Sequence, residues 1–209
     1  MSMAVSDQSN VEVPGWASTD DVVLIVEKAR DGHRRSFEEL ISLFQQEIFR
    51  MIFNRTRSRL DAEDLTQEVF LRAFKNIHKL ENGNRFRSWL FGIAINCVRD
   101  FHRKRRFFSF FEGSREDIGK EQDNRVSSDV PLDRLINKEF WMHIKAMSNR
   151  FSRLEGEVFF LRYMDHLSIK EISQALNKNE STIKTHLYRS LKKFREDKAL
   201  IGMLQGAMQ

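Results

Sequence analysis

Residues 168–194 read SIKEISQALNKNESTIKTHLYRSLKKF, and this stretch predicts two short helices joined by a tight turn. Ser168 and Glu171 stand three residues apart, the spacing at which a serine and a glutamate cap a helix start reciprocally. In the segment NKNE, Asn177 or Asn179 suits a turn residue with a left-handed backbone. The stretch therefore predicts a helix-turn-helix.

Apolar residues recur every three or four positions in both predicted helices, which defines their buried sides. They are Ile169, Ile172 and Leu176 in the first helix and Ile183, Leu187, Leu191 and Phe194 in the second. The opposite side of the second helix carries the candidate DNA-binding residues Ser181, Thr182, Lys184, Thr185, Tyr188, Arg189 and Lys192. Arg189 is long enough to bond guanine, and Lys192 and Lys193 suit phosphates. The alternative is an ordinary helical hairpin with a solvated basic face; we favour DNA binding.

The composition indicates a globular, mostly helical chain. Its 209 residues are 41% hydrophobic and 31% charged, with only 2 prolines and 9 glycines. The formal net charge of +5 weakly favours a polyanionic partner. The single cysteine, Cys97, excludes an internal disulfide and suits a reducing compartment. We find no apolar run of about 18 residues and no signal-peptide pattern, and therefore expect a cytoplasmic protein without a membrane span.

The chain divides into two predicted helical parts. Helices are expected at 18–32, 36–60, 61–80 and 85–106, then at 131–147, 152–164, 168–176 and 180–194. Capping boxes are predicted for Ser36 with Glu39 and for Ser152 with Glu155, and Gly32 is expected to end the first helix. The fold class is thus all-α, with two small helical domains.

A stretch of different composition separates these parts. Between residues 112 and 133 stand seven acidic and three basic residues, and almost none that could enter a core. We interpret residues 112–130 as a flexible acidic linker. Four phenylalanines at 107, 108, 110 and 111 precede it; we favour core packing for them over an exposed apolar patch. Residues 1–18 and 197–209 are expected to be tails.

Two motifs in the amino-terminal part decide between classes of regulator. The helix-turn-helix resembles both LuxR-type response regulators and bacterial sigma factors, but the first hundred residues lack the strand alternation of a receiver domain. They contain DAEDLTQEVFLRAF at 61–74, followed by FRSWLFGIAINCVRDFHRKRR at 86–106. With these motifs the chain resembles sigma factors of the extracytoplasmic-function (ECF) group of the sigma-70 family. The resemblance covers roughly residues 20–106 and 132–196.

The resemblance implies a polymerase-binding face on the predicted helix 61–80. Leu65, Val69, Ala73, Ile77 and Leu80 form its buried stripe, and the face matching the family's polymerase contact carries Asp61, Asp64, Gln67 and Glu68. Acidic residues near a helix start suit the dipole of any helix. That general reason does not explain Gln67 and Glu68 further along.

The resemblance also implies that the next helix and the loop before it bind the melted −10 strand. The matching positions are Asn84, Arg85, Asn96, Arg99, Asp100 and Arg103. Asn96 could read a base edge, whereas Asp100 would act only as an acceptor, for example from cytosine N4. Trp89 could stack on a base, but its apolar surroundings favour core packing.

Taken with the helix-turn-helix, the resemblance implies a dissociable sigma factor. Residues 19–111 would form region 2, binding core polymerase (its β′ and β subunits) and the −10 element; residues 131–196 would form region 4, binding the −35 element. An anti-sigma protein is a further candidate partner. We find no catalytic motif, no metal-ligand spacing among the histidines and no cofactor motif, so we expect no enzyme activity. The alternative is a stand-alone LuxR-type regulator.

Overall fold

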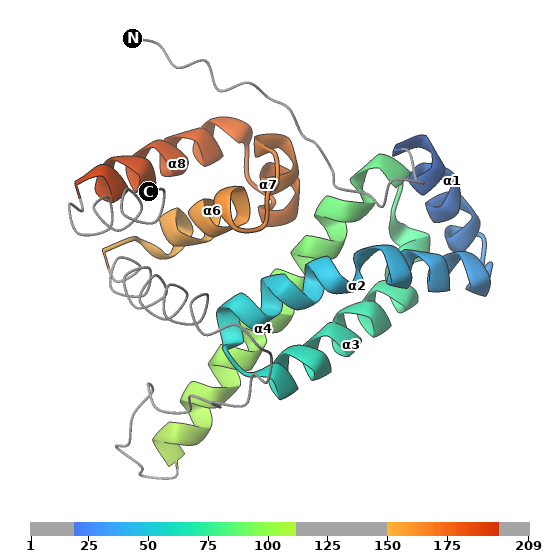
Figure 1. The fold of residues 1–209 in the computed structure, drawn as a ribbon, viewed down its shortest axis with the longest axis horizontal. Coiled ribbons are helices and arrows are strands. Elements are labelled where there is room, and N and C mark those ends of the chain that lie inside the picture. Colours follow the sequence, from blue (N-terminus) through green and yellow to red (C-terminus); the bar gives the residue numbers. More distant parts are fainter. Residues whose placement is uncertain (1–18, 112–149, 197–209) are drawn as a thin grey trace, which may run out of the picture. The chain divides into compact units, whose positions relative to one another are not determined.

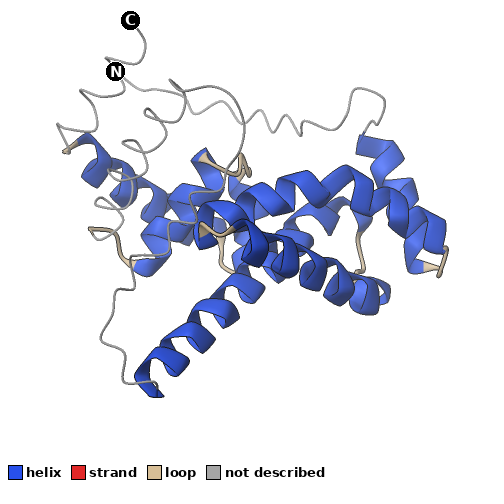
Figure 2. Cartoon of the chain, turned by 60° about the horizontal axis from the view of Figure 1, so that its bottom comes forward, coloured by secondary structure: helices blue, strands red, loops and turns tan. Residues whose placement is uncertain are grey.

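The computed structural model describes residues 19–111 and 150–196, with side chains from 20 to 105 and from 150 to 196. Every regular element in these two ranges is a helix (Figure 2), so the all-α prediction is confirmed there. The predicted tails, the acidic linker 112–130 and the predicted helix 131–147 lie outside the described residues. So do the side chains of Phe107, Phe108, Phe110 and Phe111.

The described chain forms two compact helical units, and each is considered by itself. The first contains α1 (Thr19–Arg30), α2 (Arg34–Thr56), α3 (Arg59–Asn76) and α4 (Phe86–Phe111), with short 3₁₀ helices at Ile77–Lys79 (η1) and Gly83–Arg85 (η2) between α3 and α4. Figure 1 shows α2 and α3 side by side; α2 also contacts α1 and α4, and α3 packs against α4. Helices α2 and α3 therefore each bury side chains on more than one side.

The core of this unit follows the predicted apolar spacing. All five residues of the predicted α3 stripe are buried: Leu65, Val69, Ala73, Ile77 and Leu80. On α2, Ile41 is half-buried, whereas the other predicted positions, Phe37, Leu40, Phe44, Ile48 and Ile52, are buried. A T-shaped ring contact of 5.3 Å between Phe44 and Phe86 joins α2 to the start of α4.

The start of α2 differs from the prediction. Gly32 ends α1 as expected: its φ is +93°, and His33 N–H donates to Lys28 O across the turn at 3.1 Å. That turn places the N-cap of α2 at His33, whose side chain makes no capping hydrogen bond. Ser36 is therefore a buried residue inside the first turn, and the predicted capping box of Ser36 and Glu39 is wrong.

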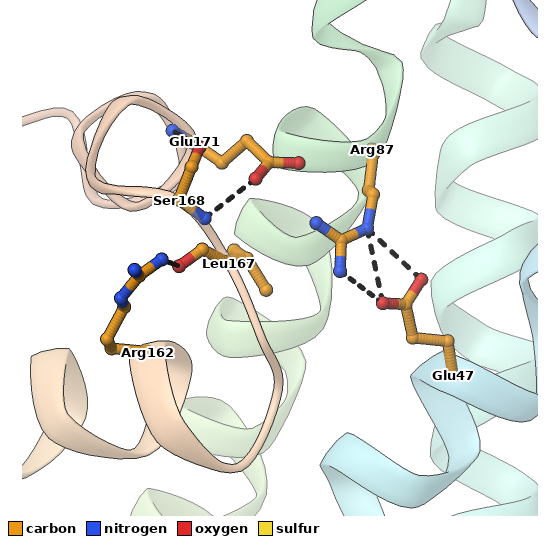
Figure 3. A network of polar contacts seen from close by, with 6 residues as sticks. All are labelled: Glu47, Arg87, Arg162, Leu167, Ser168 and Glu171. Atoms are coloured by element: carbon orange, nitrogen blue, oxygen red, sulfur yellow. Dashed lines mark hydrogen bonds and ion pairs between the residues drawn. The ribbon is translucent and has the colours of Figure 1, made fainter. Parts of the chain in front are cut away.

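The bounds of α3 and α4 also differ from the prediction. Arg57 takes a left-handed backbone (φ 60°) after α2, and Ser58 then caps α3 by accepting a hydrogen bond from Asp61 N–H. Helix α3 thus begins at Arg59, and η1 replaces α geometry after Asn76. Helix α4 continues past the predicted end at residue 106 to Phe111. Glu47 on α2 and Arg87 on α4 form an ion pair that joins the two helices (Figure 3).

The second unit contains α6 (Arg153–Tyr163), α8 (Glu180–Arg195) and the first part of α7 (Ile169–Leu176), as far as Ser173. The predicted capping box of Ser152 and Glu155 is confirmed at the start of α6. Helix α8 packs against α6, with the Phe159 and Phe194 rings stacked 5.5 Å apart. On α8, Ile183 and Leu187 are buried as predicted, and Leu191 and Phe194 are half-buried.

Candidate functional site

Local hydrogen bonds build the predicted turn between α7 and α8. Ser168 and Glu171 cap each other's backbone at 3.2 and 2.8 Å, as predicted, and Figure 3 shows the Glu171 carboxylate accepting from Ser168 N–H. Asn177 is the left-handed residue (φ 50°). Asn179 instead caps α8, accepting from Thr182 N–H at 2.8 Å and from the Ser181 hydroxyl at 2.9 Å. The two asparagines thus have separate roles in the helix-turn-helix.

Helix α8 exposes the side predicted to contact DNA. Thr182 is half-buried, and the other predicted residues are exposed: Ser181, Lys184, Thr185, Tyr188, Arg189 and Lys192. The Thr185 hydroxyl donates to Ser181 O at 2.9 Å, so both exposed hydroxyls of the first turns already use their proton within the helix. They remain acceptors. Donors for DNA on this face must therefore come mainly from Lys184, Tyr188, Arg189 and Lys192.

Lys193 has a different environment from its neighbour Lys192. Its Nζ donates to Glu155 Oε2 at 2.6 Å and to Arg150 O at 3.0 Å, across from α8 to the start of α6. Burial opposes ionisation of the Glu155 carboxyl, but the hydrogen bonds from Lys193 and Ser152 outweigh it and lower the pKa of Glu155. Lys193 therefore stabilises the packing of α8 on α6, a role within the fold that the sequence alone did not predict.

Helix α3 exposes a continuous mixed face. Leu60, Asp64, Gln67, Leu71 and Phe74 recur at spacings of four and three residues, so they lie along one side of the helix, here called the α3 face. Its three apolar residues are 67%, 61% and 52% exposed in chain order. Asp61 and Glu68, both half-buried, flank it. Sequence reasoning found the acidic and amide residues but missed the exposed apolar ones.

An ion-pair network joins Glu68 to α4. Arg72 bonds Glu68 on its own helix, and its other terminal nitrogen, Nη1, lies 3.7 Å from Asp100 Oδ2. Asp100 Oδ1 in turn lies 3.0 Å from Arg103 Nη2. The hydrogen bond to Glu68 is the main cause that raises the pKa of Arg72 above its usual value. One guanidinium is thus shared between a residue predicted to bind polymerase and one predicted to bind the −10 strand.

The other predicted −10 residues lie on η2 and α4. Asn84 and Arg85 are exposed on η2, which Asn82 caps by accepting from Asn84 N–H at 2.9 Å. On α4, Asn96 is exposed and Arg99 half-buried, with 3.5 Å between Arg99 Nη1 and Asn96 Oδ1. Trp89 is half-buried with its ring 5.9 Å from that of Phe86, which agrees with the core-packing interpretation.

Two other kinds of site, a metal centre and a membrane-spanning helix, are absent from residues 19–111 and 150–196. No group of three or more His, Cys, Asp or Glu side chains there could hold a metal ion. In the same part of the chain, no helix combines the length and apolar character that crossing a membrane requires.

Comparison with known proteins assigns both units. Residues 40–108 match the family Sigma-70 region 2, and residues 144–194 match Sigma-70, region 4. The ECF RNA polymerase sigma factor BldN of Streptomyces coelicolor is 31% identical over 80% of this chain, and SigW of Bacillus subtilis, also named an ECF sigma factor, is 26% identical over 82%. The chain belongs to the ECF group of the sigma-70 family. This sigma factor spans 62% of the length of BldN and 93% of that of SigW.

Solved structures agree on the fold of the sigma factor. CnrH, solved in complex with the cytosolic domain of CnrY, superposes with a TM-score of 0.60 at 18% identity, covering 88% of this chain and 97% of CnrH. RpoE from Bartonella quintana, in complex with the anti-sigma factor NepR, gives 0.57 at 20% identity, covering 78% and 96%. The region 2 match in the amino-terminal half does not favour the alternative of a LuxR-type regulator.

Proposed function

We propose that this sigma factor is a dissociable promoter-specificity subunit, with the α3 face docking on core RNA polymerase, η2 and α4 holding the melted −10 strand, and α8 reading the −35 duplex. One observation carries the proposal: a chain that matches both sigma regions exposes a mixed apolar and acidic face in the first and a basic helix face in the second. The proposed sites act by binding alone, so no catalytic step is assigned.

The α3 face has the chemistry of a protein-binding surface. Leu60, Leu71 and Phe74 offer apolar area that a partner could remove from water. Asp64 and Gln67 lie between them and would supply charge and hydrogen bonds, so a basic partner surface fits best. This pattern matches a binding centre in which a few apolar anchors carry most of the energy. The predicted residues Asp61 and Glu68 would contribute from its flank.

Helix α8 has the chemistry of a major-groove reader. Arg189 can donate two parallel bonds to guanine O6 and N7, and it makes no hydrogen bond or ion pair within the described part of the chain. Lys192 and Lys184 suit phosphates, although Lys184 Nζ also lies 3.7 Å from Glu180. Ser181, Thr182, Thr185 and Tyr188 would complete the contact, the hydroxyls of Ser181 and Thr185 acting as acceptors.

Transcription in vitro with purified core enzyme tests the proposal. Core enzyme and this chain together should start transcripts at promoters on which core enzyme alone is inactive. Leu71→Ala should weaken core binding about tenfold, as expected for a central apolar anchor. Leu24→Ala is the matched control, since Leu24 is a leucine on α1 with 51% exposure and lies outside the α3 face. Equal binding by both variants would refute the docking role of α3.

Alanine substitutions at Arg189 and Asn96 test the roles proposed for α8 and α4 in recognising promoter bases. Arg189→Ala should cost about 1–3 kcal/mol and relax preference at a −35 position, whereas Asn96→Ala should relax preference only at −10. If both changes relaxed the same promoter position, the roles assigned to α8 and α4 would be wrong.

An anti-sigma protein is a further candidate partner, by analogy with the complex of RpoE and NepR. It would be recognised by its competition with core enzyme for the α3 face. The proposed function requires that the chain act in the cytoplasm, where bacterial transcription takes place.

A further inference from the structure

Arg72 is a residue to which the proposed function assigns no role. It is half-buried on α3, where it contacts Glu68 of the same helix and Asp100 of α4. The α3 pair of Arg59 and Glu63 has the same i, i+4 spacing, at 2.8 Å, and serves as the comparison. Arg59 is exposed near the start of α3, and no ion pair links it to α4 in the described part of the chain. The Arg72–Glu68 pair thus differs from the Arg59–Glu63 pair because Arg72 also contacts α4, the helix proposed to hold the melted strand.

We propose that Arg72 is a positioning residue that couples polymerase binding at Glu68 to strand binding at Arg103. This inference rests on the proposed function, because it takes Glu68 to meet a cationic polymerase surface and Arg103 to meet a strand phosphate. The coupling passes through Asp100, which both Arg72 and Arg103 contact.

The direction of the coupling follows from the distances. In the free chain, Glu68 holds Arg72 in a direct hydrogen bond, so Asp100 receives only a 3.7 Å contact from it and pairs more closely with Arg103, at 3.0 Å. A polymerase cation that pairs with Glu68 would weaken its hold on Arg72. Arg72 could then bond Asp100 and release Arg103, whose side chain is 79% exposed. The released guanidinium would be available to a phosphate.

Polymerase binding can be imitated in the free chain by Glu68→Gln, which removes the charge that holds Arg72. The probe is a fluorescent oligothymidylate of 15 nucleotides, because a phosphate contact needs no sequence. Glu63→Gln is the matched control: it removes the same charge from an i, i+4 pair on the same helix, for which the described side chains of α4 provide no ion-pair partner. Any general effect of lost negative charge on DNA affinity is therefore common to both variants.

Glu68→Gln should bind the oligonucleotide about threefold more tightly than Glu63→Gln, and its affinity should fall more steeply with salt, as expected for about one added phosphate contact. Coupling of this size is modest because the side chains are partly exposed. In an Arg72→Ala background, the two glutamine variants should bind equally. Circular dichroism of each variant checks that the helices are intact. Equal affinities of Glu68→Gln and Glu63→Gln with Arg72 present would overturn the inference.

A second arm uses saturating core enzyme and separates this inference from the proposed function. With polymerase bound, Glu68 is already occupied, so wild type and Glu68→Gln should bind the oligonucleotide equally. A difference that persists in the complex would overturn the coupling while leaving polymerase binding intact. A chain that does not bind core enzyme at all would refute the proposed function, and the result with the free chain would still report on Arg72.

Discussion

Replacement of Lys193 by methionine should destabilise the second unit, whereas the same change at Lys192 should not. The two lysines are adjacent on α8, but only Lys193 reaches α6, donating to Glu155 at 2.6 Å and to Arg150 O at 3.0 Å. Lys192 is exposed on the proposed DNA face. Because methionine keeps most of the apolar stem, the comparison isolates the ammonium group.

The expected loss follows from the burial of the two partners. Removing one partner of a buried ion pair costs roughly 3–5 kcal/mol, because the remaining charge has no compensation. The Glu155 side chain is 6% exposed, but that of Lys193 is 35% exposed, so water already screens part of the attraction. Glu155 also keeps its bond from Ser152 N–H at 2.8 Å. We therefore expect Lys193→Met to cost about 2 kcal/mol, and Lys192→Met less than about 0.5 kcal/mol.

Amide hydrogen exchange of the 209-residue chain measures this loss locally, in peptides from α6 and α8. The pH dependence gives a second readout. The pKa of Glu155 is lowered in the folded chain, so the ion pair contributes fully above the pKa of a glutamate in the unfolded chain and is lost as the pH falls through the folded pKa. The deficit of Lys193→Met should therefore shrink on going from pH 7 to pH 4. Equal protection in the two variants at pH 7, or a deficit that grows on acidification, would refute the reasoning.

Three further changes test other parts of the chain. His33→Asp should stabilise the first unit by about 1 kcal/mol in urea unfolding, because His33 is an N-cap without a side-chain bond; His33→Asn, which caps without charge, separates the hydrogen bond from the dipole effect. At the exposed, left-handed His166 (φ 53°), His166→Val should lower the free energy of unfolding by about 1–2 kcal/mol, and His166→Gly should stay near wild type. Lys192→Met should weaken binding to −35 duplexes of every sequence and reduce the salt slope of the affinity by about 1. Substitutions of uncharged residues on α6 should leave this salt slope unchanged.

The sequence predicted the local features of the fold better than the contacts between elements. The boxes at Ser152 and Ser168 were right because each is closed by bonds within four residues. The same pattern failed at Ser36, because the turn after Gly32 starts α2 earlier and leaves the pattern inside the helix. The role of Lys193 could not be predicted, since its partner Glu155 is 38 positions away and only the packing of α6 on α8 brings them together.

The α3 face shows why periodicity alone missed part of the candidate site. Four apolar residues of α3 lie outside the single buried stripe that the sequence predicts: Leu60, Phe70, Leu71 and Phe74. The structure buries Phe70 and exposes the other three. Helix α3 packs against both α2 and α4, so its buried sector is wider than one stripe, and Phe70 falls within it. The sequence shows these four additional apolar residues, but which of them are buried depends on where α2 and α4 lie. An exposed apolar residue becomes a candidate anchor only once that geometry is known, and here it adjoins the acidic and amide residues that the sequence had already indicated.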